Sequence, residues 1–463
     1  MKRVITYGTF DVLHQGHINI LQRAKNLGDY LIVGVTSENY DYSRGKLNVV
    51  HSLSQRIENI KKTGLADEII VEEYLGQKID DVKRYNIDTF VIGSDWTGKF
   101  DYLKNLCEVV YLERTKGISS TTLRNSKNGI LKLGVVGNGR IAKRFVKEAK
   151  FVSGITIDYV FGIDDKSLET FCDTFGLCRY FTDYDEFLKH VDAVYVAVPH
   201  KAHYGYAKQA LLQGKHVLCE KPITLTKTET KELFALAKEK NLVLQEAIKT
   251  AYSPCFNKLV NIAQSGVIGE IRDVEATFTK LVMDKSLREY DKFQGGGSLT
   301  ELGSYPLCVI TKLLGTNASE ISYIAEMDEE TNVDLMNKVT IYYPNAVATA
   351  NVGIGMKKEG NCVISGTKGY IYVPAPWWKT EYFEIRFEDL NLTQKVFAKF
   401  DGDGLRYELA EFLNCINNKT RSYKLTGEES TFISSVIEGF SYNKNVRLIN
   451  TKKHIQDVLL KAV

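Results

Sequence analysis

Short apolar runs alternate with amphipathic stretches along the first part of the chain. Between the first two runs, Ile18, Leu21, Ala24 and Leu27 recur every three residues, a spacing that places neighbouring side chains on one helix face. The runs themselves have the length of strands: Arg3–Tyr7, Tyr30–Val35, Glu68–Val71, Thr89–Ile92 and Glu108–Leu112. Strands that alternate with helices in this way predict a parallel, doubly wound α/β sheet.

A polar turn segment, Asn125–Gly129, interrupts this pattern, which restarts with the apolar run Ile130–Val136. Further strands are predicted at Thr156–Phe161, Ala193–Ala197, His216–Cys219 and Val243–Gln245. Beyond residue 250 the β-rich segments lengthen, as at Val339–Tyr343, Ala346–Val352 and Tyr370–Val373. We therefore expect two tandem doubly wound parallel-sheet domains, 1–126 and 130–250. An α+β domain with a mostly antiparallel open sheet is expected over 251–463.

Composition excludes several classes of protein. The 463 residues carry a net charge of only +3 and a charged share of 25%, without the basic excess of a nucleic-acid-binding surface. The chain contains no apolar run long enough to cross a membrane, and its start lacks the apolar core of a signal peptide. Its eight cysteines form no C-x-x-C pair, which indicates free thiols. We expect a cytoplasmic enzyme that acts on small molecules.

The first chemical motif is the stretch Tyr7-Gly-Thr-Phe-Asp-Val-Leu-His-Gln-Gly-His17. Its two histidines could bind a metal, serve structure at a helix start, or contact phosphate. A metal site is weakly supported, because Asp11 is the only further ligand type nearby. The stretch follows a predicted strand and precedes a helix starting near Gly16 or His17, where open α/β sheets bind ligands and helix dipoles favour anions. This position favours phosphate.

Three more motifs follow in order: Arg44-Gly-Lys46 with His51, Gly93–Asp101, and Arg114–Thr122. With these motifs, residues 1–124 resemble the nucleotidyltransferases of the cytidylyltransferase superfamily, most closely the glycerol-3-phosphate cytidylyltransferases. The resemblance implies that a phosphate oxygen of the acceptor attacks the α-phosphorus of CTP, which is accompanied by Mg²⁺. Pyrophosphate leaves, and the enzyme contributes positioning and charge stabilisation.

The resemblance also implies roles for individual residues. Catalytic roles fall to His14, His17, Lys46 and Arg114. Contacts with CTP or its phosphates fall to Gly8, Thr9, Phe10, Asp11, Gly16, Arg44, Asp95, Trp96, Ser119, Ser120 and Thr121. One departure concerns the acceptor: Gly64 stands where the family often has an arginine. Glycerol 3-phosphate is the expected acceptor, with another polyol phosphate as the alternative.

The second module begins with a glycine-rich turn, Gly137-Asn138-Gly139-Arg140-Ile141-Ala142, after its first predicted strand. This G-x-G-x-x-A pattern is typical of dinucleotide binding, although glycines also serve tight turns on their own. Three later motifs lie at Val198–His203, Cys219–Pro222 and Gly295–Pro306.

Together these motifs resemble the Gfo/Idh/MocA oxidoreductases, from residue 131 to about 450. The resemblance implies an NAD(H) or NADP(H) site formed by Gly137, Asn138, Gly139, Arg140, Ile141, Asp164, Pro199, His203 and Glu220. It places Lys221 beside the nicotinamide and the substrate. Tyr305 occupies the place often filled by an acid–base histidine, as in members similar to dihydrodiol dehydrogenase; the alternative is a buried structural ring. The family further implies a homo-oligomer.

Two positions depart from the family pattern. Glu301 stands where an aspartate is usual, and Gly162 stands where a carboxylate would bind the ribose hydroxyls. Asp164 and Asp165 follow two and three residues later. If either of them reaches the ribose, NAD(H) is favoured; if neither does, NADP(H) is the alternative.

These motifs predict a bifunctional enzyme. One module would form a CDP-linked polyol such as CDP-glycerol, and the other would oxidise or reduce a related polyol or sugar. The pairing suggests precursors of cell-surface polymers such as teichoic acid or capsule. The alternative is a cytidylyltransferase whose oxidoreductase-like part is not catalytic and serves oligomerisation or sensing.

Overall fold

The structure is a computed structural model of the whole chain. It describes residues 1–11, 13, 15–37, 40–41, 49, 51–74, 76–113, 130–442 and 444–449. The predicted site residues outside this set are His14, Arg44, Lys46, Arg114, Ser119, Ser120 and Thr121. The chain divides into two compact units, 1–132 with 149–158 and 133–148 with 159–463.

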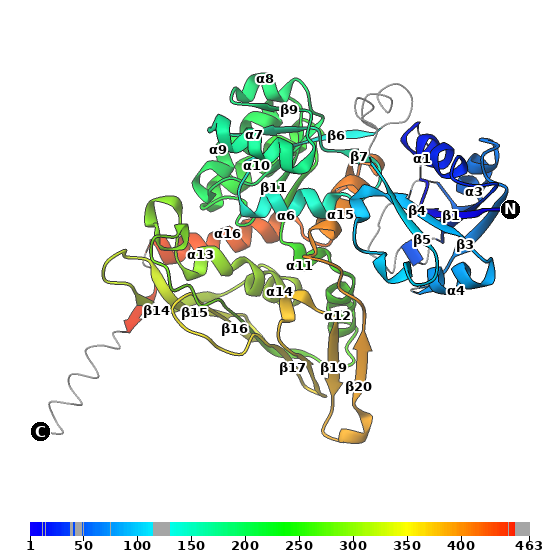
Figure 1. Cartoon of the computed structure of the whole chain (residues 1–463). Coiled ribbons are helices and arrows are strands. Elements are labelled where there is room, and N and C mark those ends of the chain that lie inside the picture. Colours follow the sequence, from blue (N-terminus) through cyan, green and yellow to red (C-terminus); the bar gives the residue numbers. More distant parts are fainter. Residues whose placement is uncertain are drawn as a thin grey trace, which may run out of the picture. The chain divides into compact units, whose positions relative to one another are not determined.

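The first unit contains a five-stranded parallel sheet in the order β3-β2-β1-β4-β5 (Figure 1). Its strands are β1 (Arg3–Gly8), β2 (Tyr30–Thr36), β3 (Glu68–Glu72), β4 (Thr89–Gly93) and β5 (Glu108–Leu112). The helices between them are α1 (Gln15–Lys25), α3 (Leu53–Lys61) and α4 (Gln77–Arg84). All five predicted strands are present, and the predicted parallel, doubly wound sheet is confirmed.

Alternation of side chains along β1 gives this sheet a core on each face. Val4 packs on one side with Leu21 of α1 and Ile60 of α3. Ile5 packs on the other side with Val82 of α4 and Phe90. Helices therefore cover both faces and leave the carboxyl edge of the strands for ligands.

The next sheet is parallel too, in the order β12-β11-β10-β6-β8-β9, with the short β7 paired to β6. Its strands are β6 (Leu131–Val136), β7 (Ile155–Thr156), β8 (Tyr159–Phe161), β9 (Arg179–Phe181), β10 (Ala193–Val196), β11 (His216–Glu220) and β12 (Leu244–Ala247). Its helices are α6 (Arg140–Ala149), α7 (Asp165–Phe175), α8 (Tyr184–Leu188), α9 (His200–Leu212) and α10 (Lys227–Glu239). The single strand predicted over Thr156–Phe161 is wrong. The polar Asp158 interrupts the run and accepts a hydrogen bond from the Thr156 hydroxyl, 2.9 Å away.

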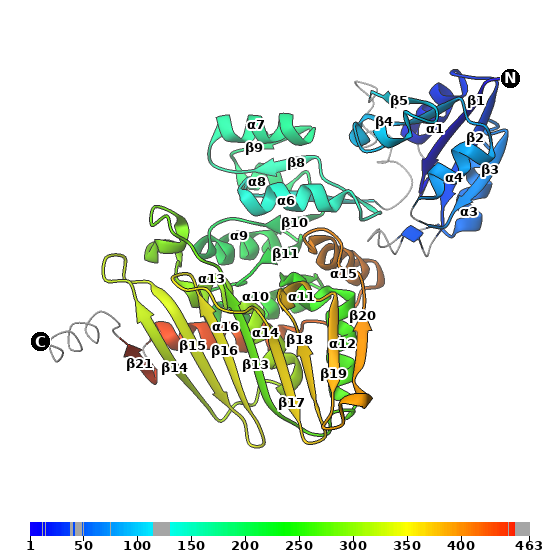
Figure 2. The ribbon, with the colours of Figure 1, turned by 60° about the horizontal axis from the view of Figure 1, so that its bottom comes forward.

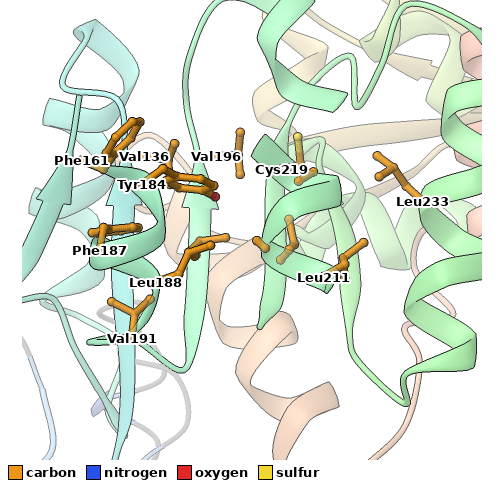
Figure 3. Packing of buried hydrophobic residues seen from close by; sticks show 14 of the residues in the cluster. Val136, Phe161, Tyr184, Phe187, Leu188, Val191, Val196, Leu211, Cys219 and Leu233 are labelled. Atoms are coloured by element: carbon orange, nitrogen blue, oxygen red, sulfur yellow. The ribbon is translucent and has the colours of Figure 1, made fainter. Parts of the chain in front are cut away.

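Helix α8 packs tightly on this second sheet. Figure 3 shows Tyr184, Phe187 and Leu188 directed toward the strand residues Val136 and Val196. A β-carbon at Gly134 of β6 would lie 2.4 Å from the Phe187 ring, so only glycine permits this approach. The glycine therefore allows β6 and α8 to pack closely together.

The last sheet has nine strands, in the order β20-β19-β18-β17-β13-β16-β15-β14-β21 (Figure 2). Its strands are β13 (Ile271–Thr279), β14 (Glu320–Met327), β15 (Asp334–Tyr342), β16 (Val347–Gly353), β17 (Cys362–Gly366), β18 (Tyr370–Val373), β19 (Tyr382–Arg386), β20 (Gln394–Phe397) and β21 (Val446–Ile449). The pairs β13–β16 and β14–β21 are parallel and the other pairs are antiparallel. The predicted mostly antiparallel sheet is confirmed.

Six helices accompany this sheet: α11 (Lys249–Tyr252), α12 (Pro254–Gln264), α13 (Ser298–Leu302), α14 (Ser304–Leu314), α15 (Leu405–Asn418) and α16 (Gly427–Ser441). Helices α13 and α14 contact its central strands. Along β15, Val339 and Ile341 are buried, whereas Lys338 and Tyr342 are exposed, so the two faces differ in environment. Within the described part of the chain, no helix is long and apolar enough to span a bilayer.

Candidate active sites

The first candidate site lies where β1 ends. Strand β1 pairs with β2 on one side and β4 on the other, so its carboxyl end is the point at which the strand order reverses. Ligands bind at such switch points in open α/β sheets. The segment Gly8–Asp11 leaves the sheet here, and α1 begins at Gln15, which puts Gly16 and His17 in the first helical turn.

A buried guanidinium holds this loop. Arg56 of α3 is fully buried, and its Nη1 donates to the carbonyl oxygens of Thr9 and Thr36, at 2.8 and 2.7 Å. The same Nη1 lies 3.5 Å from Oδ2 of Asp41, and Oδ1 of Asp41 accepts from the Thr9 hydroxyl at 2.8 Å. The path of the backbone after β1 is therefore fixed by charge-assisted hydrogen bonds.

The other loop residues also have fixed partners. Asp11 accepts from the backbone N–H of His51 at 2.9 Å. Phe10 adopts a positive φ of 53°, and its ring meets the His17 imidazole edge-on with 5.5 Å between centroids. A β-carbon at Gly8 would lie 3.0 Å from the Phe10 ring, so the glycine makes room for it. His17 thus sits against an aromatic ring at a helix start.

Asp95 and Trp96 lie in a 3₁₀ turn, Ser94–Trp96, directly after β4. Because β4 is parallel to β1, this turn is at the same edge of the sheet as Gly8. The Lys99 ammonium lies 4.9 Å from the centre of the Trp96 ring. The structure thus brings Gly8, Thr9, Phe10, Asp11, Gly16, His17, Asp95 and Trp96 to one edge.

The second candidate site is built on the turn after β6. Gly137 has a φ of +99°, and a β-carbon there would lie 2.6 Å from the carbonyl oxygen of Ala197. At Gly139, by contrast, a β-carbon would meet nothing within 4 Å. This open space faces the start of α6 at Arg140, so a pyrophosphate can approach the backbone there. The turn therefore fits a dinucleotide.

Side chains around this turn are already engaged. The Asn138 amide donates to the Ser167 hydroxyl at 2.8 Å. The backbone N–H of Ser167 donates to the side chain of Asp164 at 3.0 Å, so Asp164 caps the start of α7. The hydrogen bonds from Ser167 lower the pKa of Asp164. Arg140 lies 3.1 Å from a carboxylate oxygen of Glu289. Ile141 is half-buried in the first turn of α6.

Lys221 and Tyr305 meet on the other side of the candidate dinucleotide site. Lys221 follows β11, and its ammonium lies 5.9 Å from the centre of the Tyr305 ring of α14. Burial, followed by the charges of Glu220 and Glu408, raises the pKa of Tyr305 well above its ordinary value. The phenol is therefore neutral and retains its proton for transfer.

Two neighbours hold the Lys221 turn. Glu220 accepts from the Tyr195 hydroxyl at 2.5 Å and from the Lys221 backbone N–H at 3.2 Å, and burial raises its pKa. His203 is fully buried, with ring nitrogens 2.8 Å from the carbonyl oxygen of Pro222 and 2.9 Å from that of Val198. Burial lowers the pKa of His203 to about 4, so the ring is neutral, and its single N–H donates to one of these two carbonyl oxygens. His203 is therefore placed to support the turn that carries Lys221.

Three matches to protein-family models cover most of the chain. Residues 5–126 match a family described as cytidylyltransferase-like. Residues 131–248 match an oxidoreductase family with an NAD-binding Rossmann fold, and residues 256–372 match the Gfo/Idh/MocA C-terminal domain. A glycerol-3-phosphate cytidylyltransferase of Bacillus spizizenii is 52% identical over 124 residues, which are 27% of this chain and 95% of that relative.

The chain is a fusion of a cytidylyltransferase and a Gfo/Idh/MocA oxidoreductase.

Other relatives resemble one half or the other. A glycerol-3-phosphate cytidylyltransferase of Staphylococcus aureus is 46% identical over 28% of this chain and 97% of its own length. A trans-1,2-dihydrobenzene-1,2-diol dehydrogenase of Oryctolagus cuniculus is 29% identical over 66% of this chain and 95% of its own length. A solved 3-ketoreductase from Actinomadura kijaniata, in complex with NADP and TDP-benzene, has a TM-score of 0.63 and 23% identity. It covers 69% of this chain and 98% of its own, which confirms the fold.

The sequence did not reveal an ion pair in the cytidylyltransferase domain. Lys78 of α4 and Glu72 at the end of β3 are both buried and form an ion pair at the carboxyl edge of the sheet. The ammonium of Lys78 lies 4.5 Å from the centre of the Tyr7 ring, whose hydroxyl donates to Asp81 at 2.7 Å. The only sequence signal was an acidic residue directly after a predicted strand.

The oxidoreductase part contains buried acids that the sequence pattern also did not reveal. Glu408 of α15 is fully buried, and neither carboxylate oxygen has a hydrogen-bond partner among the described residues. Burial, followed by the charge of Glu220, raises the pKa of Glu408 well above its ordinary value. Burial also raises the pKa of Glu246 to about 7. Burial therefore shifts both acids toward the protonated form.

Proposed function

We propose that the first domain transfers CMP from CTP to a small polyol phosphate, with glycerol 3-phosphate as the first candidate. The observation that carries this proposal is the 52% identity with a glycerol-3-phosphate cytidylyltransferase over 95% of that relative's length. The buried Arg56 network, which fixes the loop Thr9–Asp11 at the switch point, supports it. The products would be CDP-glycerol and pyrophosphate.

In this mechanism the protein supplies no covalent nucleophile. His17 and His14 would hold the α-phosphate oxygens as the acceptor oxygen bonds to phosphorus and the bond to pyrophosphate breaks. Gly8, Gly16 and the backbone of Thr9–Asp11 would permit close approach of the triphosphate. Lys46, Arg44, Arg114, Ser119, Ser120 and Thr121 would hold the phosphates, and Asp95 and Trp96 would line the nucleotide. Mg²⁺ would enter with CTP.

We propose that the second part exchanges hydride between NAD(H) or NADP(H) and the carbonyl carbon of a polyol-related ketone, aldehyde or sugar. The nicotinamide supplies or accepts the hydride. In the direction of reduction, Tyr305 would donate its hydroxyl proton to the carbonyl oxygen, and the Lys221 ammonium would hold that oxygen and stabilise the resulting phenolate. The 5.9 Å between the ammonium and the ring supports this arrangement.

Cofactor contacts are proposed from the same geometry. Gly137, Gly139 and the first turn of α6 with Arg140 and Ile141 would receive the pyrophosphate. Asn138, in the turn after β6, is joined through Ser167 to Asp164 at the start of α7, where the ribose of the adenosine half would bind. Pro199 and Glu220 would border the nicotinamide, and His203 would support the turn at Lys221.

The two activities would serve one pathway, in which reduction yields an alcohol and cytidylyl transfer activates it, as in precursors of cell-surface polymers. We propose domains at 1–126, 130–250 and 251–463, because the three sheets fall within these ranges. A homo-oligomer is proposed from the family. The alternative is an oxidoreductase part that does not catalyse a reaction, and it predicts no oxidation of NADH or NADPH.

The test is a two-part screen of the full-length protein. Polyol phosphates are supplied with CTP and Mg²⁺, and pyrophosphate release is measured; keto sugars and polyol-derived ketones are supplied with NADH or NADPH, and the loss of reduced nicotinamide is followed. We expect turnover in both parts. A protein that releases pyrophosphate but neither binds nor oxidises NADH or NADPH would instead support the non-catalytic alternative. Failure to release pyrophosphate with any polyol phosphate would refute the first activity.

A further inference from the structure

Lys249 of the oxidoreductase part is a cation that has no ion-pair partner among the described residues. It is the first residue of α11, directly beyond the carboxyl end of β12, and its side chain is half-buried. No hydrogen bond or ion pair connects its ammonium to another residue within the described ranges of the chain. Burial, followed by the charge of Lys379, lowers the pKa of Lys249. A desolvated ammonium of this kind is stabilised by an anion.

Two further cations lie beside it and share one carboxylate. Lys379 Nζ is 3.3 Å from one oxygen of Asp403, and Arg144 Nε is 3.9 Å from the other. Burial acts to raise the pKa of Asp403, but the charges of Lys249, Lys379 and Arg144 outweigh it, and the pKa lies below its ordinary value. Three cations around one carboxylate leave an excess of positive charge.

The neighbouring glutamates do not remove this excess. Glu408 lies close enough to influence Lys249, but the two form no ion pair among the described residues, and burial raises the pKa of Glu408. Burial also raises the pKa of Glu220, which is already hydrogen-bonded to the Tyr195 hydroxyl. Among the described residues, therefore, no carboxylate forms an ion pair with Lys249, and Lys379 shares Asp403 with Arg144.

A row of aromatic rings connects this cluster with the reactive end of the site. Tyr305 meets Phe278 of β13 edge-on, with 5.1 Å between centroids. Phe278 in turn stacks on Trp378, at 3.7 Å and with 8° between the planes. Trp378 precedes Lys379, and its carbonyl oxygen accepts from the Thr250 hydroxyl at 2.7 Å, which joins this segment to the residue after Lys249. A small, extended substrate could contact both ends of this row.

We propose that Lys249 and Lys379, bordered by Arg144, bind a phosphate group of the oxidoreductase substrate, which is a phosphorylated polyol, ketone or aldehyde. This inference rests on the proposed oxidoreductase function and specifies its substrate class. With the phosphate at this site, the carbonyl carbon at the other end of the molecule reaches Lys221 and Tyr305. Reduction then yields a polyol phosphate, which is the acceptor class of the cytidylyltransferase domain.

The test uses full-length protein with bound NADH or NADPH, whose fluorescence reports on the oxidoreductase site alone. The probes are glycerol 3-phosphate and inorganic phosphate, with glycerol as the phosphate-free comparison and CDP-glycerol as a nucleotide-linked phosphate. We expect glycerol 3-phosphate to bind at least about tenfold more tightly than glycerol, since one such charge contact is worth about 1.4 kcal/mol. This preference should weaken as salt concentration rises.

Variants locate the effect. Lys249→Gln and, separately, Lys379→Gln should each weaken glycerol 3-phosphate binding about tenfold and leave glycerol and cofactor binding unchanged. Lys338→Gln is the matched control, because Lys338 is an exposed lysine of β15. Melting transitions establish that each variant is folded, and the Lys379 variant carries the test if Lys249→Gln does not fold.

The outcomes separate this inference from the proposed function. If NADH or NADPH binds but phosphate-bearing probes bind no better than glycerol, or both lysine variants behave like wild type, the phosphate site is wrong and the oxidoreductase function stands. If only CDP-glycerol shows the lysine-dependent effect, the site holds a nucleotide-linked phosphate and the link to the polyol phosphate is refuted. If neither nicotinamide binds, the oxidoreductase function and this inference fail together.

Discussion

The ammonium of Lys221 donates a hydrogen bond to the backbone carbonyl oxygen of Glu301, with 2.8 Å between Nζ and O. This bond joins the end of β11 to α13, which are 80 residues apart in the sequence. A carbonyl partner leaves the positive charge of Lys221 unneutralised, so the ammonium remains able to attract a substrate oxygen. The Glu301 carboxylate is engaged separately, 3.0 Å from Arg288.

Lys221→Ala should abolish oxidoreductase turnover, because it removes the cation that holds the reacting oxygen. Loss of such a contact costs about 3 kcal/mol or more, a rate decrease of roughly a hundredfold or greater. Cytidylyl transfer should change by less than about twofold, because the first sheet has its own hydrophobic clusters. The measurements are nicotinamide oxidation and pyrophosphate release on the same preparation. Loss of both activities would show that the two sites are catalytically coupled.

Arg56→Met should inactivate the cytidylyltransferase domain, because Arg56 positions the loop after β1 and does not itself need to contact the substrate. Removing the guanidinium takes the hydrogen-bond donor from the carbonyl oxygens of Thr9 and Thr36 and removes an ion-pair partner from the buried Asp41 carboxylate, a loss of about 3–5 kcal/mol. A lower melting temperature for this domain and loss of pyrophosphate release are expected, with nicotinamide binding retained. Arg56→Lys keeps the charge and should retain part of the stability. Wild-type pyrophosphate release in Arg56→Met would contradict the positioning role.

The sequence alone was sufficient to predict the features that depend on the local pattern of residues. Periodic apolar residues predicted all five strands of the first sheet, and the glycines at 137 and 139 predicted the turn before α6. The one misplaced strand, Thr156–Phe161, has a polar residue at its break, and the hydrogen bond from Thr156 to Asp158 forms only in the folded chain. Local propensity cannot show that interruption.

Contacts between distant residues were not predictable in the same way. Arg56 and Thr9 are 47 residues apart, and Thr250 and Trp378, which adjoin Lys249 and Lys379, are 128 residues apart. Charged residues at such positions look like ordinary solvated helix or loop charges until the sheets place them together. Asp164 illustrates a related limit: its N-cap bond to Ser167 follows from helix-start chemistry, but whether it also contacts a ribose depends on the cofactor.

His17→Ala and His14→Ala should each reduce pyrophosphate release about a hundredfold or more, because each loses a contact with charge that develops on the α-phosphate. His17 lies in the first turn of α1 against the Phe10 ring, so Phe10→Leu should give a smaller decrease because the imidazole is held less firmly. Nicotinamide oxidation is the internal control. Full activity in both folded histidine variants would show that the two histidines have a structural role. Zinc bound stoichiometrically at the two histidines would instead favour a metal site.

Glu246→Gln should stabilise the oxidoreductase part in a pH-dependent manner. Burial raises the pKa of Glu246 from 4.5 to about 7, so the folded state binds its proton more tightly than the unfolded state. The stabilisation from this proton is complete below pH 4.5 and is lost as pH rises toward 7, a change of about 3 kcal/mol. Glutamine carries no titrating proton and still accepts from the Ile223 N–H, which is 3.0 Å from Oε1. The variant should therefore melt at a higher temperature than wild type at pH 8 and at nearly the same temperature at pH 4.5.

Glu270→Gln, at an exposed carboxylate, is the control and should show no such difference. Equal melting shifts for Glu246→Gln at both pH values would show that Glu246 is not protonated by burial.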